Sequence, residues 1–397
     1  MGQRNLKIGY VIKYFHPIKG GAENNLLNIA LRSVEHGYEV HVFTSDRKGK
    51  ERCERLEDEY EGIKIHRSKT LFDFSHYLGV YPSLLSNILK YDLDIIHTSG
   101  FGFIWHDFVL ILKKLFSRKT KFICTPHGPF MALGKYNVVQ RILKFSYTAV
   151  QRLFLNWLYD AVIQVNTFQW QWILKYGINK KKVVFVPNGI SSDVVNTVVS
   201  EKQLKDFKKE HDLQKKFIIS SLGRITEYKG IQHLVQVLPE LLEIKSNIVL
   251  LIMGRDEGYV RKLKTQVEKL RLKDSVRLIV NVSEEVKYVG LESSEIFYFG
   301  SQWEAFGIVL LEAMSKSNAF VSTKTEGGNF LTTDGVNGYL YDYGDTDKLL
   351  ELLKDVIKDE AKMRAMQKEN LERVRKYTWG NIYIKYYLPI LDSLIGG

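Results

Sequence analysis

Residues 216–230 read KFIISSLGRITEYKG, and they carry the clearest fold signal in the chain. The apolar run Lys216–Leu222 predicts a buried strand that ends at a glycine. Arg224 and Lys229 follow, with a glycine on either side, at the junction between this strand and a helical pattern. Glycine lets the backbone approach a ligand, and a guanidinium beside an ammonium suits a diphosphate. The residues therefore predict a strand–loop–helix unit that binds an anion.

Short apolar runs alternate with helical patterns on both sides of this unit, which is typical of βαβ units and a parallel sheet. We therefore predict an α/β chain with two Rossmann-like, doubly wound sheets. The second sheet begins near residue 216, after a polar connector over residues 191–216 with a short helix. Besides Lys216–Leu222, the expected strands are Leu6–Ile12, Glu39–Thr44, Ile63–Arg67, Ile95–Thr98, Lys121–Thr125, Ala161–Val165, Val183–Val186, Ile248–Met253, Val276–Val280, Ile296–Tyr298 and Ala319–Ser322.

The length of 397 residues also indicates two cores, because a single core stops growing near about 250–300 residues. We expect one domain over residues 1–190, a second over residues 191–376, and a C-terminal segment over residues 377–397. Within that last segment, Tyr377–Leu394 is aromatic and amphipathic.

The composition is that of a soluble globular protein, with 45% apolar and 26% charged residues. The two cysteines, Cys53 and Cys124, are far apart, which argues against a disulfide framework and a structural zinc site. A reducing, cytoplasmic compartment is the simplest interpretation. The N-terminal residues predict a strand rather than a signal peptide, and no run approaches the ~18 uncharged apolar residues that span a bilayer.

The net charge of +12 favours an anionic partner: a phosphorylated substrate, a membrane surface or nucleic acid. A solvated basic surface is the alternative. We expect no nucleic-acid partner, because the sequence contains no legible RNA- or DNA-binding module.

Two short motifs follow strands of the first domain, where parallel sheets bind ligands. Gly20-Gly21 lies between the first strand and the helix Ala22–His36, and a helix N-terminus presents free N–H groups. A simple tight turn is the alternative, and no Walker-type lysine follows. Thr125-Pro126-His127-Gly128 closes a later strand and places His127 where it can reach a cleft, although a single histidine is more often structural.

The segment SQWEAFGIVLLE, residues 301–312, contains two carboxylates, Glu304 before a helix and Glu312 about two turns further on. At a rise of ~1.5 Å per helical residue they lie about 10–12 Å apart, too far for an acid/base pair on one bond. They suit the two ends of an elongated ligand. The backbone amides of Phe306, Gly307 and Ile308 would point at phosphates between them.

Other acidic and histidine residues do not form a metal site in this sequence. His97, His106 and Asp107 lack ligand spacing, and Asp92-Leu93-Asp94 precedes a strand rather than following one. The loop Gly254–Gly258 follows a strand and is a candidate for lining a base pocket. We therefore predict no metal.

Taken in order, these motifs resemble those of the retaining family-4 glycosyltransferases of the GT-B fold, the glycosyl transferases group 1. The resemblance covers essentially the whole chain. It rests on the Gly-Gly loop, T-P-H-G, V-P-N-G-I at Val186–Ile190, G-R-x-x-x-x-K-G, and the two glutamates separated by seven residues. Tyr377-Thr378-Trp379 resembles the family's closing aromatic segment, which crosses back onto the first domain.

The resemblance implies two domains that face each other across a donor-binding cleft. Residues 1–190 would form the acceptor side, residues 191–376 would bind a nucleotide sugar, and residues 377–397 would return as a helix to the first domain. It implies a metal-independent, hexosyltransferase-like enzyme that needs no cofactor and takes a nucleotide-diphosphate sugar as co-substrate. Retention is usually ascribed in this family to attack on the face from which the phosphate leaves.

Roles carry over residue by residue as implications of the resemblance. Arg224 and Lys229 would hold the donor diphosphate, Glu304 would bind sugar hydroxyls, and Glu312 would bind the ribose. The catalytic set is His127, Arg224, Lys229 and Glu304. The donor-binding set is Gly20, Gly21, Arg224, Lys229, Glu304, Phe306, Gly307, Ile308 and Glu312.

Three departures from the family pattern bear on the donor sugar. Gly300 stands where proline is frequent, and Ser315–Ala319 replaces a small-Gly-x-Pro segment. Asn329-Phe330-Leu331 follows Gly327-Gly328, where an acidic residue is usual. These changes affect the identity and orientation of the sugar more than the diphosphate site.

Two segments are both basic and apolar, which fits an anionic lipid surface. Val138–Trp157 contains Arg141, Lys144 and Arg152, and Phe108–Lys121 contains Arg118 and Lys119. A partly buried helix with basic edges is the alternative. We expect a lipid-linked, glycan or other hydroxyl acceptor, and attachment at the cytoplasmic membrane face is one of the two localisations that the sequence allows. The oligomeric state stays open.

Three other functions remain as alternatives at this point. A nucleotide-sugar epimerase of the same fold would need further acid/base residues. A non-catalytic sugar-nucleotide-binding subunit would be free to lose the charged residues that are present here. A dehydrogenase is least favoured, because no G-x-G-x-x-G opens either sheet.

Overall fold

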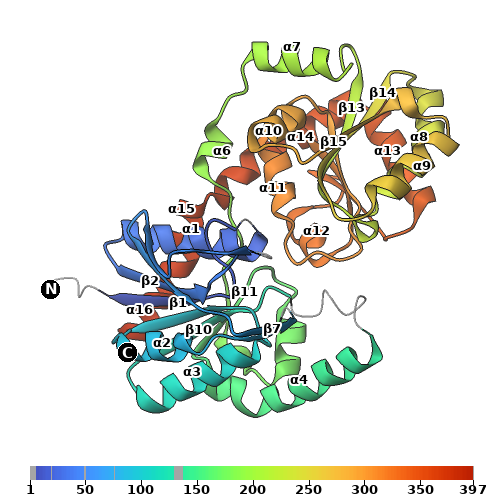
Figure 1. Ribbon diagram of the computed structural model, residues 1–397. Coiled ribbons are helices and arrows are strands. Elements are labelled where there is room, and N and C mark those ends of the chain that lie inside the picture. Colours follow the sequence, from blue (N-terminus) through green and yellow to red (C-terminus); the bar gives the residue numbers. More distant parts are fainter. Residues whose placement is uncertain (1–5, 19, 49–50, 76, 129–136, 397) are drawn as a thin grey trace. The chain divides into compact units, whose positions relative to one another are not determined.

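The computed structural model describes residues 6–18, 20–48, 51–75, 77–128 and 137–396 (Figure 1). The chain forms two compact units. Unit 1 comprises Met1–Asn188 and Trp379–Gly397, and unit 2 comprises Gly189–Thr378. The boundaries expected from the sequence lie after residues 190 and 376.

The sheet of unit 1 is wound outward in two directions from its first strand. Strand β1 (Lys7–Val11) pairs in parallel with β2 (Glu39–Ser45) on one side and with β9 (Ile95–Ser99) on the other. The order is β12-β11-β10-β9-β1-β2-β6-β5, and among these pairings only β5 with β6 is antiparallel. The predicted doubly wound sheet is therefore confirmed. The remaining strands of this sheet are β5 (Glu57–Tyr60), β6 (Ile63–Ser68), β10 (Lys121–Thr125), β11 (Ala161–Gln164) and β12 (Val183–Phe185).

Short antiparallel pairs escape sequence prediction because each of their strands has only two to four residues. They are β3 (Arg47–Lys48) with β4 (Glu51–Arg52), and β7 (Phe72–Ser75) with β8 (Leu78–Val80). The helices of unit 1 are α1 (Gly21–Glu35), α2 (Ser83–Lys90), α3 (Ile104–Phe116), α4 (Val138–Leu158) and α5 (Trp170–Ile173), with 3-10 turns at Leu174–Tyr176 and Lys180–Lys182.

The C-terminal segment belongs to unit 1 and is held there by buried hydroxyl groups. It consists of α15 (Trp379–Ile382), a π-helical turn (Tyr383–Tyr387) and α16 (Leu388–Ile395). The Tyr383 hydroxyl lies 3.0 Å from Ser33 Oγ on α1, and the Tyr387 hydroxyl lies 2.9 Å from His97 Nδ1 on β9. Because both tyrosines are buried, these bonds satisfy polar groups that would otherwise be costly inside the unit.

Unit 2 contains a second doubly wound sheet, in which the order of the strands reverses beside β13 (Phe217–Ile225). The order is β15-β14-β13-β16-β17-β18, with every pairing parallel. The other strands are β14 (Ile248–Asp256), β15 (Val276–Val280), β16 (Ile296–Phe299), β17 (Ala319–Thr323) and β18 (Gly338–Tyr341). The last of these, β18, was not expected from the sequence.

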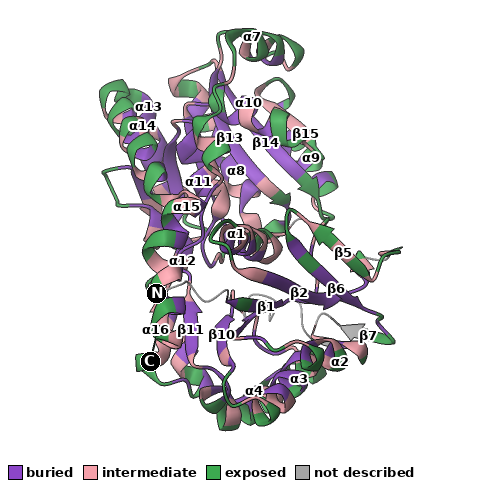
Figure 2. Cartoon of the chain, turned by 90° about the vertical axis from the view of Figure 1, so that its left-hand side faces the viewer, coloured by how far each residue is buried: buried purple, intermediate pink, exposed green. Residues whose placement is uncertain are grey.

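Helices of unit 2 pack on the sheet through a continuous apolar core, and Figure 2 shows the strands as mostly buried. They are α6 (Ser192–Asn196), α7 (Glu201–Glu210), α8 (Ile231–Ile244), α9 (Val260–Lys269), α10 (Glu284–Glu292), α11 (Ile308–Ser315), α12 (Glu326–Leu331), α13 (Thr346–Lys358) and α14 (Glu360–Val374), with 3-10 turns at Glu227–Lys229, Lys273–Ser275 and Arg375–Tyr377. The prediction of one short helix in residues 191–216 is wrong. Both α6 and α7 form there, because Ser191 and Ser200 cap separate helix starts.

Glycine is required where the ends of β13 and β14 pair. Gly223 and Gly254 are partners in the register, and Gly254 has φ +155°. A Cβ at Gly254 would lie 1.6 Å from the carbonyl oxygen of Gly223. This close approach lets the two strands extend together to Arg224 and Arg255, which are register partners. The helices in the described part of the chain include none long and apolar enough to span a bilayer.

Candidate functional site

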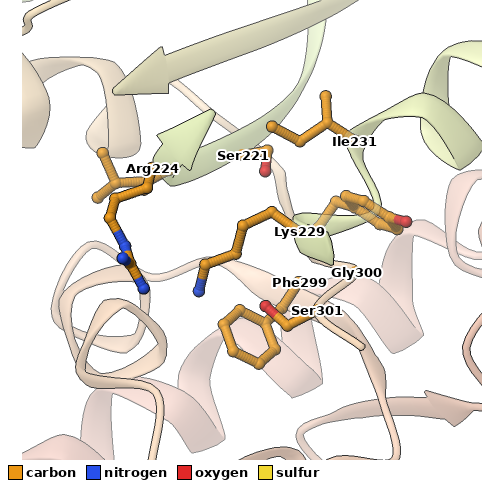
Figure 3. Close-up of a pocket in the computed structure, with 10 residues that line it drawn as sticks. Ser221, Arg224, Lys229, Ile231, Phe299, Gly300 and Ser301 are labelled. Carbon is orange, nitrogen blue, oxygen red and sulfur yellow. The ribbon is translucent and has the colours of Figure 1, made fainter. Parts of the chain in front are cut away.

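The charged residues predicted in unit 2 gather where the strand order reverses, between β13 and β16. In open α/β sheets this is where ligands bind, outside the carboxyl ends of the strands. A pocket lies there, lined by the end of β13, the loop that follows it, and the end of β16 (Figure 3). Arg224 and Lys229 both line it and extend their nitrogens toward the same side, with Phe299 and Ser301 on the opposite wall.

Arg224 and Lys229 differ in how firmly the protein holds them. The Lys229 side chain is only 12% exposed, and its Nζ lies 2.8 Å from Glu304 Oε2. Its ammonium also lies 5.6 Å from the centre of the Phe299 ring. The Arg224 side chain is 46% exposed, lies 3.4 Å from Glu257, and donates a hydrogen bond to the Tyr228 hydroxyl. The pocket therefore has one fixed and one accessible cation, a combination that suits a diphosphate.

The loop that carries Lys229 is fastened to the end of β16. Gly230 has φ +67°, and a Cβ there would lie 2.1 Å from the carbonyl oxygen of Gly300. The Tyr298 hydroxyl donates a 2.8 Å hydrogen bond to the carbonyl of Gly230. Tyr228 stacks on Trp303 with ring centres 4.3 Å apart and planes 4° from parallel. The sequence gives only a weak sign of this stacked pair, an aromatic residue in each of the two charged motifs, and the pair was not predicted.

Glu304 lies in the loop before α11, as the sequence predicts. Its backbone carbonyl accepts a 3.0 Å hydrogen bond from the N–H of Gly327, which fixes the loop. Gly307 is the N-cap of α11 with φ +80°, a conformation that suits glycine. Phe306 is buried and precedes the cap. The predicted amides of residues 306–308 therefore lie at the N-terminus of α11, whose first turn leaves N–H groups without helical partners.

Glu312 of α11 is only 13% exposed and forms an ion pair with Lys287, a residue outside the charged motifs predicted from the sequence. Lys287 Nζ on α10 lies 2.8 Å from Glu312 and 2.6 Å from Glu284. Burial raises the pKa of Glu312, although Lys287 opposes this shift. Burial alone would lower the pKa of Lys287, but the nearby carboxylates raise it above its usual value. This carboxylate is thus paired with a cation and is mostly withdrawn from solvent.

The predicted residues of unit 1 lie at the ends of its own strands and helices. Gly20 is the N-cap of α1, and Gly21 is its first residue. His127 has φ +55°, and burial lowers the pKa of its ring to about 4. Its Nε2 has no hydrogen-bond partner among the described residues. On the neighbouring strand β9, His97 Nε2 lies 2.8 Å from Thr125 Oγ1.

Two minor candidates have structural contacts. Asp94 accepts a 3.0 Å hydrogen bond from the N–H of Lys7, so it holds the start of β1. Asp256 accepts hydrogen bonds from the N–H groups of residues 258–260, which closes the turn after β14. In unit 2 the structure thus brings Arg224, Lys229 and Glu304 together, while Glu312 lies in a separate ion-pair cluster. The described residues contain no cluster of three or more His, Cys, Asp or Glu side chains suited to a metal.

Two family models match the chain, one in each half. The model described as Glycosyltransferase Family 4 matches residues 19–194, and the model described as Glycosyl transferases group 1 matches residues 202–374.

Among curated relatives, the phosphatidylinositol N-acetylglucosaminyltransferase gpi3 subunit of Schizosaccharomyces pombe is 24% identical over 93% of this chain and 77% of its own length. The alpha-monoglucosyldiacylglycerol synthase of Streptococcus pneumoniae is 23% identical over 98% of this chain and 87% of its own length. A crystal structure of Anabaena HepE in complex with UDP and glucose covers 98% of this chain and all of its own, with a TM-score of 0.75 and 17% identity. This structural likeness confirms the predicted GT-B fold.

Proposed function

The chain belongs to the family-4 glycosyltransferases, and from this membership we propose that it transfers a sugar from a nucleotide-diphosphate sugar to an acceptor hydroxyl with net retention. The observation that carries the proposal is the pair of cations, Arg224 and Lys229, in the pocket between β13 and β16. In this proposal the negatively charged diphosphate of the nucleotide binds where these side chains converge. UDP in the HepE structure is consistent with a donor of this class.

The cations stabilise the charge that develops when the donor breaks. As the bond between the anomeric carbon and the diphosphate oxygen lengthens, negative charge grows on the leaving group, and fixed donors lower the barrier. Lys229 is held in place by Glu304, so little reorganisation accompanies the step. We therefore propose that these two residues supply the electrostatic role without a metal.

The sugar is oriented by Glu304, whose carboxylate lies beside Lys229 and accepts hydrogen bonds from sugar hydroxyls in this proposal. The acceptor oxygen attacks the anomeric carbon on the face from which the diphosphate leaves. Its proton passes to the departing phosphate oxygen, so the transfer needs no further base. Gly20, Gly21 and His127 of unit 1 stay predicted contacts of the donor.

The acceptor is proposed to be lipid-borne, because unit 1 exposes an apolar and basic surface. Helices α3 and α4 contact each other and expose large apolar side chains while lacking exposed carboxylates. Residues 138–158 contain no Asp or Glu, and the one acid of α3, Asp107, is buried. We call the exposed apolar set the α3/α4 surface: Ile104, Phe108, Leu115, Phe116, Val138, Val139, Ile142, Leu143, Phe145, Val150, Leu153 and Trp157.

Exposed cations on and beside these helices suit an anionic bilayer, and the names of two relatives contain a lipid, phosphatidylinositol in one and monoglucosyldiacylglycerol in the other. Arg141 and Arg152 are exposed on α4, and Arg118 and Lys119 follow α3. Basic residues near a membrane contribute about 1 kcal/mol each to binding anionic lipid. Lys144 was expected to belong to this basic surface, and that expectation is wrong, because its side chain is only 8% exposed.

The donor site is tested by thermal stabilisation with UDP, GDP and ADP. A ligand that binds only the folded chain stabilises it by about 2.7 kcal/mol at 100 times its dissociation constant. We expect one nucleotide diphosphate to raise the melting temperature, equally with EDTA and with added MgCl2. Absence of a shift with every nucleotide would overturn the donor assignment, and a shift only with magnesium would overturn metal independence. Incubation with the matching nucleotide sugars then identifies the transferred sugar, and NMR of the product reports its anomeric configuration.

The α3/α4 surface is tested by sedimentation with vesicles containing phosphatidylglycerol. Leu153 is 84% exposed, and burying a leucine contributes about 1.5–3 kcal/mol. We expect Leu153→Glu to weaken vesicle binding by about tenfold or more, because it removes this contribution and adds a repelled charge. Val198→Glu is the control, since Val198 is similarly exposed at 87% but belongs to unit 2. Equal vesicle binding by both variants and the unmodified chain would contradict a membrane role for this surface.

A further inference from the structure

The sheet of unit 1 has its own reversal point, between β1 and β9. Strand β9 ends at Ser99, and residues 100–103, Gly-Phe-Gly-Phe, connect it to α3. Gly100 and Gly102 have φ values of +95° and +88°, which only glycine adopts readily. A glycine-rich turn from a strand into a helix N-terminus presents N–H groups and the positive end of the helix dipole to an anion.

A buried cation reaches this turn from another helix. Lys144 on α4 is 8% exposed, and its Nζ lies 2.9 Å from the position that a Cβ on Gly102 would occupy. The ammonium lies 4.6 Å from the centre of the Tyr77 ring and has no hydrogen-bond partner among the described residues. The turn and the lysine are independent features. The N–H groups of Gly100 and Ile104 are bonded to the carbonyls of Thr125 and Tyr77, so the turn contributes mainly the positive end of the α3 dipole beside the Lys144 ammonium.

From this convergence we propose that Lys144 and the 100–103 turn bind a phosphate group of the acceptor. The inference rests on the proposed function and narrows its acceptor to a phosphorylated molecule. The α3/α4 surface begins on the same two helices, so an apolar portion of such an acceptor can lie along α4 while its phosphate meets Lys144. The sugar would then be transferred to a hydroxyl near that phosphate.

A purely structural role explains Lys144 poorly. Burying an ammonium without a hydrogen-bonded partner costs free energy, and burial lowers the pKa of Lys144 to about 8. The nearby carboxylate of Asp107 instead accepts hydrogen bonds from Tyr147 at 2.7 Å and from Gln151 at 3.0 Å. Asp107 attracts Lys144 without a hydrogen bond to it, and a phosphate would provide the hydrogen-bonded anion that Lys144 lacks among the described residues. Functional sites often carry such a cost in stability.

The experiment measures inorganic phosphate binding by calorimetry in the Arg224→Ala chain, where the diphosphate pocket of unit 2 is disabled. We expect phosphate to bind, and Lys144→Met in this background to weaken binding by about tenfold or more, as expected for loss of a charged hydrogen bond. Lys113→Met is the matched control: Lys113 is also buried in unit 1, but its Nζ is bound to the carbonyl of Tyr91 at 2.9 Å. Phosphate binding unchanged by Lys144→Met, or lost equally in the control, would overturn the proposal.

The melting temperature of the unliganded protein distinguishes an anion-binding role of Lys144 from a purely structural one. If Lys144 binds an anion, Lys144→Met leaves the unliganded melting temperature unchanged or raises it. A lower melting temperature together with unaltered phosphate affinity would overturn the proposal. The nucleotide-diphosphate shift must persist in Lys144→Met alone, so failure of the donor site and failure of the phosphate site give different results.

Vesicles identify the source of the phosphate. Lipid-borne phosphate predicts that Lys144→Met weakens binding to vesicles with phosphatidic acid, whose phosphate is a monoester, more than to vesicles with phosphatidylglycerol. A free phosphorylated acceptor predicts loss of inorganic phosphate binding with equal binding to both vesicles. Both outcomes support a phosphate site at Lys144, and they assign it to different molecules.

Discussion

Arg224→Ala is expected to abolish stabilisation by the nucleotide diphosphate and to lower kcat by about 10²–10³-fold, the usual loss when one donor to a developing charge is removed. Fold stability should change little, because the Arg224 side chain is 46% exposed and its ion pair with Glu257 is long, at 3.4 Å. The measurements are melting temperature with and without the nucleotide, and initial rates at saturating donor. A large loss of kcat would show that the guanidinium stabilises the leaving group in the transition state. A rise in KM alone would show instead that it binds substrate and transition state equally well.

The matched control is Lys262→Ala. Lys262 is an exposed cation of unit 2 that lies 3.7 Å from Glu227 and does not line the pocket. The control should retain both nucleotide stabilisation and kcat. Arg224→Ala with wild-type nucleotide stabilisation would contradict the diphosphate assignment, and equal losses in the two variants would indicate a non-specific charge effect.

Lys287→Met is expected to destabilise unit 2 by about 3–5 kcal/mol, because it leaves the buried carboxylate of Glu312 without its cation. The double variant Lys287→Met/Glu312→Leu should recover much of this loss, since it removes the uncompensated charge as well. Equilibrium unfolding in denaturant measures both effects. The control is Lys362→Met, which breaks a more exposed pair with Asp355 at 2.8 Å and should cost no more than about 1 kcal/mol.

The pH dependence of the folding stability of Lys287→Met gives a second test of the ion pair with Glu312. Burial raises the pKa of Glu312 above its ordinary 4.5, and removing Lys287 removes the opposing influence. The folded variant then holds a proton that the unfolded chain releases, so its stability falls as pH rises above that ordinary value. We expect the deficit of Lys287→Met to be smaller near pH 5 than near pH 8. A deficit independent of pH would contradict an ionised Glu312 as its cause.

Sequence patterns predicted most of the strands because these signals are local. Buried parallel strands are apolar runs bounded by turn residues, and Phe217–Ile225 and Ile248–Asp256 stand out for this reason. The charged motifs were also legible, since a glycine-flanked Arg224 or a Glu304 before a helix is defined by its neighbours in the chain. Short strands such as β5 and β7, with four residues each, have no such continuous apolar run and were missed.

Which distant residues meet is a different question, and only the tertiary structure answered it. Arg224 and Lys229 share a pocket with Phe299 because β13 pairs with β16, the first strand of the other half of the sheet. The fold also brings Lys287 next to Glu312, and Lys144 next to the turn at Gly102. No local sequence pattern predicts either contact. A periodic sequence determines which face of an element is buried, whereas long-range packing determines what it is buried against. The sequence thus determined the family, the elements and the charged motifs. The fold decided which charges are paired and which, like Lys144, have no hydrogen-bond partner in the part of the chain that the structure describes.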